Sequence, residues 1–143
     1  MKYTAIRIAG LVGAALLTAC AGLPGVDAEP APPVSANSAV VALVDDARSA
    51  VGAGKPDAAG AALERALRIE PRNAALWQEL ARLRLSQGQY QQAESLAARS
   101  NSYAGTDRRL RALNWRLIGD ARNQLGDVRG AELAYARADE FER

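Results

Sequence analysis

A short helix-turn-helix unit recurs along this chain, and the recurrence restricts the possible folds more than any other feature of the sequence. The clearest copy spans residues 73–100 and carries two apolar stripes at helical spacing, Trp77, Leu80, Ala81 and Leu85, then Ala93, Leu96 and Ala97. A break at Gly88 separates the two stripes. Because so short a helix pair cannot bury both of its faces alone, further copies are expected to stack on it.

Two further copies flank this unit. The spacing of Trp77, Leu80 and Ala81 returns in Trp115, Ile118 and Gly119. The turn glycines Gly54, Gly88 and Gly126 are separated by 34 residues (88 − 54) and by 38 residues (126 − 88). A small residue holds the same place after each turn, at Ala59, Ala93 and Ala131.

The period near 34, the Trp-x-x-Leu spacing, the small residues and the closing Pro71 resemble the tetratricopeptide repeat. This resemblance covers about residues 40–142 and implies an all-α fold, a short α-solenoid of about three repeats at residues 40–72, 73–105 and 106–143. Arg84 and Arg122 depart from the pattern, because the family has a Tyr at their positions. The alternative is a plain bundle of helical hairpins.

The repeats predict six helices, at residues 39–53, from Pro56 to about 69, 74–87, 91–100, from about 107 to 125, and 128–141. Ser38 and Asn73 are the expected N-caps of the first and third helices, and Thr106 or Asp107 that of the fifth. The longer interval between the last two turn glycines is assigned to an extended junction at residues 101–106.

Residues 1–19 have the pattern of a secretory signal peptide, with Lys2 and Arg7 before an apolar run of ten residues from Ile8 to Leu17. So short a run cannot span a bilayer as a helix. The sequence Leu-Thr-Ala before Cys20 looks like the bacterial lipobox. That resemblance implies cleavage before Cys20, a diacylglycerol on its sulfur and a fatty acyl group such as palmitate on its amine. Two or more chains anchor a protein firmly.

A Pro-rich flexible linker is predicted at residues 20–37, because Pro24, Pro30, Pro32 and Pro33 fall in this stretch and no large apolar cluster does. The 17 residues after Cys20 reach roughly 50 Å if extended. Ala21 follows the lipobox cysteine where enteric-type sorting uses Asp for inner-membrane retention. The expected location is therefore the outer membrane, with a lipid anchor and the domain facing the periplasm.

The charge and composition exclude several classes of function. Two of the 18 basic residues precede Cys20, so the remainder carries 16 basic (18 − 2) and 16 acidic side chains and offers no basic field for nucleic acid. The chain has no His and one Cys, which removes the commonest general base and any internal disulfide. Since no nucleophile–base pair is apparent either, the sequence predicts a protein without catalytic residues, cofactor or metal.

In the tetratricopeptide family the first helices of successive repeats line a concave groove. Carried over by register, the groove positions are Val44, Arg48, Gln78, Arg82, Arg116 and Asp120. Arg48, Arg82 and Arg116 are expected to grip carboxylates of a partner, or alternatively to be solvated. Possible exposed contacts outside the groove are Tyr103, Arg108 and Arg109. Trp77 and Trp115 are expected to pack between helices.

These features predict an interaction protein with a protein partner in the cell envelope. The arrangement of lipobox, Pro-rich tether and small repeat domain resembles outer-membrane lipoproteins that activate class A penicillin-binding proteins in peptidoglycan synthesis. A pilotin-like assembly factor for a secretin or type IV pilus is one alternative, and a structural envelope lipoprotein is another. An enzyme would need catalytic groups that the sequence does not show.

Overall fold

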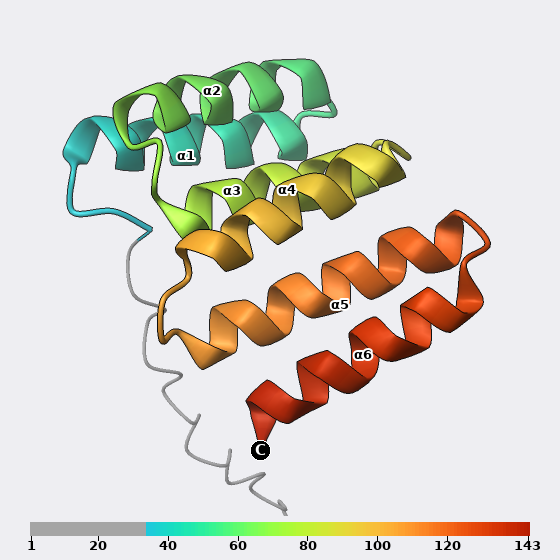
Figure 1. Cartoon of the computed structure of the whole chain (residues 1–143). Helices are drawn as coiled ribbons and strands as arrows, with labels where there is room; N and C mark the ends of the chain where they lie inside the picture. The colour runs from blue at the N-terminus through green and yellow to red at the C-terminus, as the bar shows by residue number, and fades with distance from the viewer. Residues whose placement is uncertain (1–33) are drawn as a thin grey trace, which may run out of the picture. The chain divides into compact units, whose positions relative to one another are not determined.

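Three antiparallel helix pairs stack in sequence order in the computed structural model of this protein, which describes residues 34–143 (Figure 1). The predicted signal peptide, Cys20 and most of the predicted linker lie outside the described residues. The six helices confirm the expected all-α solenoid of three repeats: α1 (Ser38–Gly52), α2 (Pro56–Ile69), α3 (Ala74–Ser86), α4 (Tyr90–Tyr103), α5 (Arg108–Gln124) and α6 (Val128–Glu142). No helix within residues 34–143 is long and apolar enough to cross a membrane.

The helix ends follow from local side-chain chemistry. Asn73 and Asp107 accept hydrogen bonds from the backbone N–H groups of Leu76 and Leu110, as expected of N-caps. The N-cap of α1 is Asn37 rather than Ser38, because the Asn37 side chain accepts from the Ala39 N–H at 3.0 Å. The three tight turns need the left-handed backbone that glycine adopts without strain, and their φ values are 68°, 74° and 83° at Gly54, Gly88 and Gly126.

The longer interval between the last two turn glycines comes from a longer helix, so the expected extended junction at residues 101–106 is wrong. Both inter-repeat junctions have four residues, 70–73 and 104–107. Helix α5 has 17 residues and α3 has 13, and this difference of four residues equals the difference of four in glycine spacing (38 − 34). One extra helical turn keeps the apolar face of α5 in register, because 3.6 residues complete a turn.

The core consists of two clusters that overlap at α3. The first joins α1, α2 and α3 through aliphatic side chains such as Val40, Leu63 and Leu76. The second joins α3 to the last three helices through Ala81, Ala97, Leu117, Ile118 and Ala134. Both clusters lie within the compact unit Pro32–Arg143, which is therefore a self-contained folding unit.

A buried polar network links the second and third repeats. Ser100, fully buried, donates to the backbone oxygen of Ala74 at 2.8 Å, and the fully buried Asn114 donates to Ser100 Oγ at 2.7 Å and to Asn101 Oδ1 at 3.0 Å. Helix α4 continues through Asn101 to Tyr103, past its expected end at Ser100. Gly105, with φ 53°, follows the C-cap at Ala104, and glycine in this place is a common sign of a helix end.

Arg84 and Arg122, which replace the family's Tyr, form ion pairs between neighbouring repeats. Arg84 reaches Glu64 on α2 at 2.9 Å, and Arg122 reaches Glu94 on α4 at 2.7 Å. Arg84 passes over Gly60, where an added Cβ would lie 3.3 Å from its guanidinium nitrogen. A partly buried ion pair therefore lies at each repeat boundary, at the position where the sequence departs from the family pattern.

Tyr135 of α6 packs closely against α5. Gly119 on α5 occupies the position of Ala81 on α3, and a Cβ at Gly119 would lie 2.4 Å from the Tyr135 ring. The Tyr135 hydroxyl donates to Asp120 Oδ1 at 2.8 Å. The small Gly119 therefore lets the Tyr135 ring lie close to the backbone of α5.

The segment before α1 is fastened to the junction between α2 and α3. Ser35 Oγ donates to Glu70 Oε1 at 2.6 Å, while the Asn73 amide donates to Glu70 Oε2 at 2.7 Å and to the Val34 backbone oxygen at 2.9 Å. These hydrogen bonds, from Ser35 first and then Asn73, hold the pKa of Glu70 below its ordinary value of 4.5. The predicted linker thus makes ordered contacts from Val34 onward.

Gly119→Ala should destabilise the domain, because the new methyl group would overlap the Tyr135 ring. Overpacking of this kind costs about 1–3 kcal/mol and outweighs the gain in helix propensity of up to about 1 kcal/mol. Urea unfolding monitored by circular dichroism gives the difference in the free energy of unfolding. Gly52→Ala is the matched control, since nothing lies within 4 Å of a Cβ there. Equal stability of the two variants would contradict the close α5–α6 packing.

Glu70→Gln should lower stability at neutral pH and have little effect in acid. A carboxyl group with a depressed folded pKa contributes stability above its unfolded pKa and loses it as the pH falls through the folded value. The loss at neutral pH should be about 1 kcal/mol, because the charge-assisted hydrogen bonds are partly exposed. Thermal unfolding at several pH values tests this, and a difference that persists well below pH 4.5 would contradict the assignment.

Candidate protein-interaction groove

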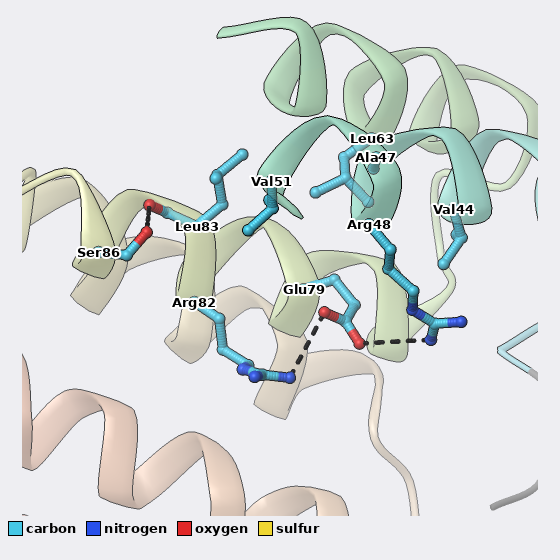
Figure 2. A pocket seen from close by; sticks show the side chains of 9 residues that line it. All are labelled: Val44, Ala47, Arg48, Val51, Leu63, Glu79, Arg82, Leu83 and Ser86. Carbon is cyan, nitrogen blue, oxygen red and sulfur yellow. Dashed lines mark hydrogen bonds and ion pairs between the residues drawn. The ribbon is translucent and has the colours of Figure 1, made fainter. Parts of the chain in front are cut away.

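A groove of about 410 Å³ lies between the first helices of repeats one and two (Figure 2). Helices α1 and α3 form its walls, and Leu63 of α2 contributes to its apolar lining. The other apolar lining residues are Val44, Ala47, Val51 and Leu83, and the polar ones are Arg48, Glu79, Arg82 and Ser86. Val51 is 55% exposed, so an apolar surface is open to a ligand at one end of the groove.

Two arginines flank one glutamate along this groove. Figure 2 shows Glu79 between Arg48 and Arg82, with N···O distances of 3.9 and 3.6 Å. Arg48 also contacts Asp45 on its own helix at 3.3 Å. The side chains of Arg48 and Arg82 are 58% and 60% exposed, whereas that of Glu79 is 23% exposed. Both guanidinium groups are therefore accessible to solvent, while the less exposed Glu79 carboxylate contacts each of them.

This arrangement suits a ligand that has both a carboxylate and an apolar side chain. Two arginines meet two carboxylates, those of Glu79 and Asp45, so the groove rim has no net charge (2 − 2). Each guanidinium has five N–H donors in a planar fork, so donors remain for an incoming carboxylate. Val51 and Leu83 offer apolar contact beside these donors. Within residues 34–143 no group of three or more His, Cys, Asp or Glu side chains is placed to hold a metal ion.

The structure brings some of the predicted groove residues together. Arg48 and Arg82 share Glu79, and Val44, only 2% exposed, lies in the lining below them. Gln78 is 8% exposed and lies outside the lining, because its side chain turns into the protein. Arg48 and Arg82 thus present the accessible polar groups.

Arg116 and Asp120 interact with α6 instead. Arg116 binds both carboxylate oxygens of Glu142 through Nε and a terminal nitrogen at 3.0 and 2.7 Å, and it does not share Glu79 with Arg48 and Arg82. This pair raises the pKa of Arg116 and lowers that of Glu142, chiefly through the hydrogen bonds and their charges. Asp120 lines a separate cavity of about 310 Å³ and accepts the Tyr135 hydrogen bond.

The predicted contacts outside the groove lie where helix pairs join. Tyr103 ends α4 and is half-buried, with Arg72 over its ring at 5.9 Å. Arg108 donates to the Glu140 backbone oxygen at 2.9 Å and lies over the Phe141 ring, whereas Arg109 is exposed. Part of the basic cluster at the start of α5 thus contacts the end of α6.

The two tryptophans are half-buried. Trp77 donates from Nε1 to the Pro71 backbone oxygen at 2.9 Å and carries Arg99 over its ring at 4.5 Å. Trp115 packs against the second core cluster. Both contacts fit the expected packing between helices, and neither residue lines the groove.

Sequence reasoning missed six residues of the groove lining: Ala47, Val51, Leu63, Glu79, Leu83 and Ser86. Glu79 has a recognisable pattern, because it precedes Arg82 by three residues and such pairs lie on one helix face. The repeat register predicted two positions on each first helix, four residues apart. The groove is also lined by residues on adjacent parts of the helix surface. The alignment of α1 with α3, which only packing fixes, determines which rows face each other.

Three stacked helix-turn-helix pairs with a groove along their first helices define a tetratricopeptide-repeat protein, and the family model described as tetratricopeptide repeat matches residues 50–114. The globular C-terminal domain of P. aeruginosa LpoP is 41% identical, with a TM-score of 0.71 over 73% of this chain and 99% of that one. The chain therefore belongs to the tetratricopeptide-repeat family that includes LpoP.

A more distant structure shares the fold alone. The N-terminal domain of stress-induced protein-1 (STI-1) from C. elegans has a TM-score of 0.66 and 14% identity, over 73% of this chain and 87% of that one. No curated protein sequence matches this chain significantly. The likeness to LpoP therefore carries the functional argument.

Arg48→Ala and Arg82→Ala should each change the free energy of unfolding by less than about 0.5 kcal/mol, because exposed ion pairs contribute little. Arg122→Ala is the comparison, since it removes a partly buried pair with Glu94 and should cost about 1 kcal/mol or more. Urea unfolding measures all three. A large loss for the groove variants would show that these arginines serve the fold rather than a ligand.

Proposed function

We propose that this chain is a lipid-anchored, periplasm-facing scaffold that docks a class A penicillin-binding protein and activates it. The observation that carries the proposal is 41% identity to the globular domain of LpoP over 99% of that domain. The sequence resemblance to lipoprotein activators of these synthases points the same way. The lipid anchor at Cys20 and the outer-membrane location are parts of this proposal.

The groove between α1 and α3 supplies the proposed contact face. Its two outward guanidinium groups are only loosely held by Glu79, at 3.6 Å or more. Arg48 would exchange its exposed 3.3 Å pair with Asp45 for a partner's carboxylate. The apolar lining of the groove accommodates an adjacent aliphatic side chain. The proposed ligand is therefore an acidic segment of the synthase that also carries an apolar anchor.

The attachment of Val34 and Ser35 limits how far the domain moves from its anchor. Thirteen residues (33 − 20) separate Cys20 from Val34, and they extend over about 40 Å at most. This is shorter than a tether that runs to Asn37. A synthase anchored in the inner membrane must then contribute much of the distance across the periplasm.

In-cell photo-crosslinking with the probe at Arg82, followed by mass spectrometry, tests the partner. A penicillin-binding protein should be captured at Arg82 but not from Arg129, an exposed position on α6 outside the groove. Capture of a secretin would favour a pilotin-like role instead. Capture of a synthase from Arg129 alone would support the proposed partner but contradict the groove as the contact face.

The Arg48→Glu/Arg82→Glu variant should weaken synthase binding by about tenfold or more, because it removes charge-assisted hydrogen bonds and adds repulsion. Lys55→Glu/Arg129→Glu makes the same change in net charge away from the groove and should bind normally. Affinities measured with the purified synthase give the comparison. Equal weakening by both variants would mean that overall charge, not the groove, governs binding.

A further inference from the structure

The two ends of the helix pairs differ in charge. We call the end that contains the inter-repeat junctions and residues 34–37 the junction end, and the end that contains the three glycine turns the turn end. Figure 1 shows the junctions on the left and the turns on the right. The charge of each end is the balance of charged side chains in its connections and in the five helical residues on either side of each connection.

The junction end is strongly basic by this count. Residues 65–78 and 99–112 contain seven arginines and two acidic residues, a balance of +5 (7 − 2). Residues 48–60, 82–94 and 120–132 at the turn end contain six basic and five acidic residues, a balance of +1 (6 − 5). The last five residues of α6 and Arg143 lie at the same end and add three acidic and one basic side chain, so the balance of the whole end is +3 (5 + 1 − 3). Each of these acidic side chains pairs with Arg116 or Arg137. An excess of positive charge is therefore centred on the two junctions.

Most of these arginines are exposed and uncommitted to carboxylates. Arg65, Arg68, Arg72, Arg99 and Arg109 are exposed, and none of them forms an ion pair within residues 34–143. They come from α2, the first junction, α4 and α5, so the fold gathers them from segments distant in sequence. Such a cluster attracts an extended anionic surface more than a single carboxylate.

Two aromatic rings lie among the arginines. Arg99 stacks over Trp77 at 4.5 Å, and Arg72 lies over Tyr103 at 5.9 Å. Both rings are half-buried. Trp, Tyr and Arg together are typical of protein surfaces at the lipid headgroup level, where rings and aliphatic stems meet the interface and charges meet phosphates.

The chain also leaves the domain at this end. Val34 and Ser35 are hydrogen-bonded to Asn73 and Glu70 in the first junction, so the segment that leads back to Cys20 starts beside the arginines. This step rests on the proposed function, because it takes Cys20 as the lipid attachment site. A tether of about 40 Å at most then starts at the basic end and keeps this end within reach of the membrane.

We propose that the junction end rests on anionic phospholipid headgroups of the membrane that carries the lipid anchor. The arginines bind lipid phosphates, and Trp77 and Tyr103 lie at the interface beside them. The groove residues Arg48 and Arg82 lie outside the junction-end residues, so membrane contact leaves them accessible to a protein partner. The bound orientation presents the groove sideways to the membrane rather than toward it.

Vesicle sedimentation with residues 32–143, the self-contained unit that lacks Cys20, tests this surface directly. The unit should bind vesicles of phosphatidylcholine mixed with phosphatidylglycerol, lose binding as salt is raised, and ignore vesicles of phosphatidylcholine alone. Each arginine removed should lower the partition coefficient about fivefold. Arg68→Gln/Arg109→Gln should therefore lose about 25-fold, and Arg72→Gln/Arg99→Gln at least as much.

The matched control is Lys55→Gln/Arg129→Gln, which removes the same charge from the turn end and should bind as the unaltered unit does. Circular dichroism verifies that each variant is folded. If Arg72→Gln/Arg99→Gln fails to fold, Arg68→Gln/Arg109→Gln still tests the inference, because it removes no contact with an aromatic ring. Absence of binding to anionic vesicles, equal binding to neutral ones, or an equal loss in the control would overturn the inference. The inference would also be overturned if the unit did not bind vesicles and substitution of these arginines instead abolished capture of the crosslinked protein.

Failure of the proposed function would look different, because the unit without Cys20 binds vesicles independently of lipidation and of any synthase. Release of the Cys20→Ala chain from the membrane fraction tests the anchor separately. Vesicle binding without a captured synthase would reject the partner and keep the membrane surface. Capture of the synthase without vesicle binding would support the proposed partner and contradict the membrane surface.

Discussion

Close approach of helices at small side chains is the constraint on which the rest of this structure depends. Ala59, Ala93 and Ala131 recur five residues after the turn glycines, and all three are almost fully buried. Larger residues there would push the two helices of each pair apart. Because the two helices of each pair lie close together, the pairs stack into two core clusters, and α1 and α3 then lie near enough to form the groove.

Polar contacts fix the stack where apolar packing is least specific. Alanine-rich helix faces are similar in shape along their length, so apolar packing alone distinguishes poorly between helix alignments. The pairs Arg84–Glu64 and Arg122–Glu94 and the Asn114 network each form in one alignment only. The same use of arginine distinguishes the two surfaces proposed for binding. In the groove the arginines pair with carboxylates, whereas most arginines at the junction end are exposed and form no ion pair within residues 34–143.

The local features were predictable because each has a short-range cause. Helical periodicity predicted all six helices, and the cap at Asn73 and the turns at Gly54, Gly88 and Gly126 depend on a few adjacent residues. The end of α4 and the length of α5 were missed, since the extra turn could lie in a helix or a junction and only burial against neighbouring helices decides between them. Gly105 offered a clue to the first of these.

The sequence by itself determined the class of fold, the number of repeats and the arginines available for binding, because these follow from periodicity and composition. Tertiary structure alone decided what each arginine does. Arg48 and Arg82 share one glutamate, Arg116 is bound by α6, and Arg72 and Arg99 meet aromatic rings at the junction end. Those assignments depend on which helices lie side by side and in what register, and that arrangement is a property of the packed domain rather than of any single repeat.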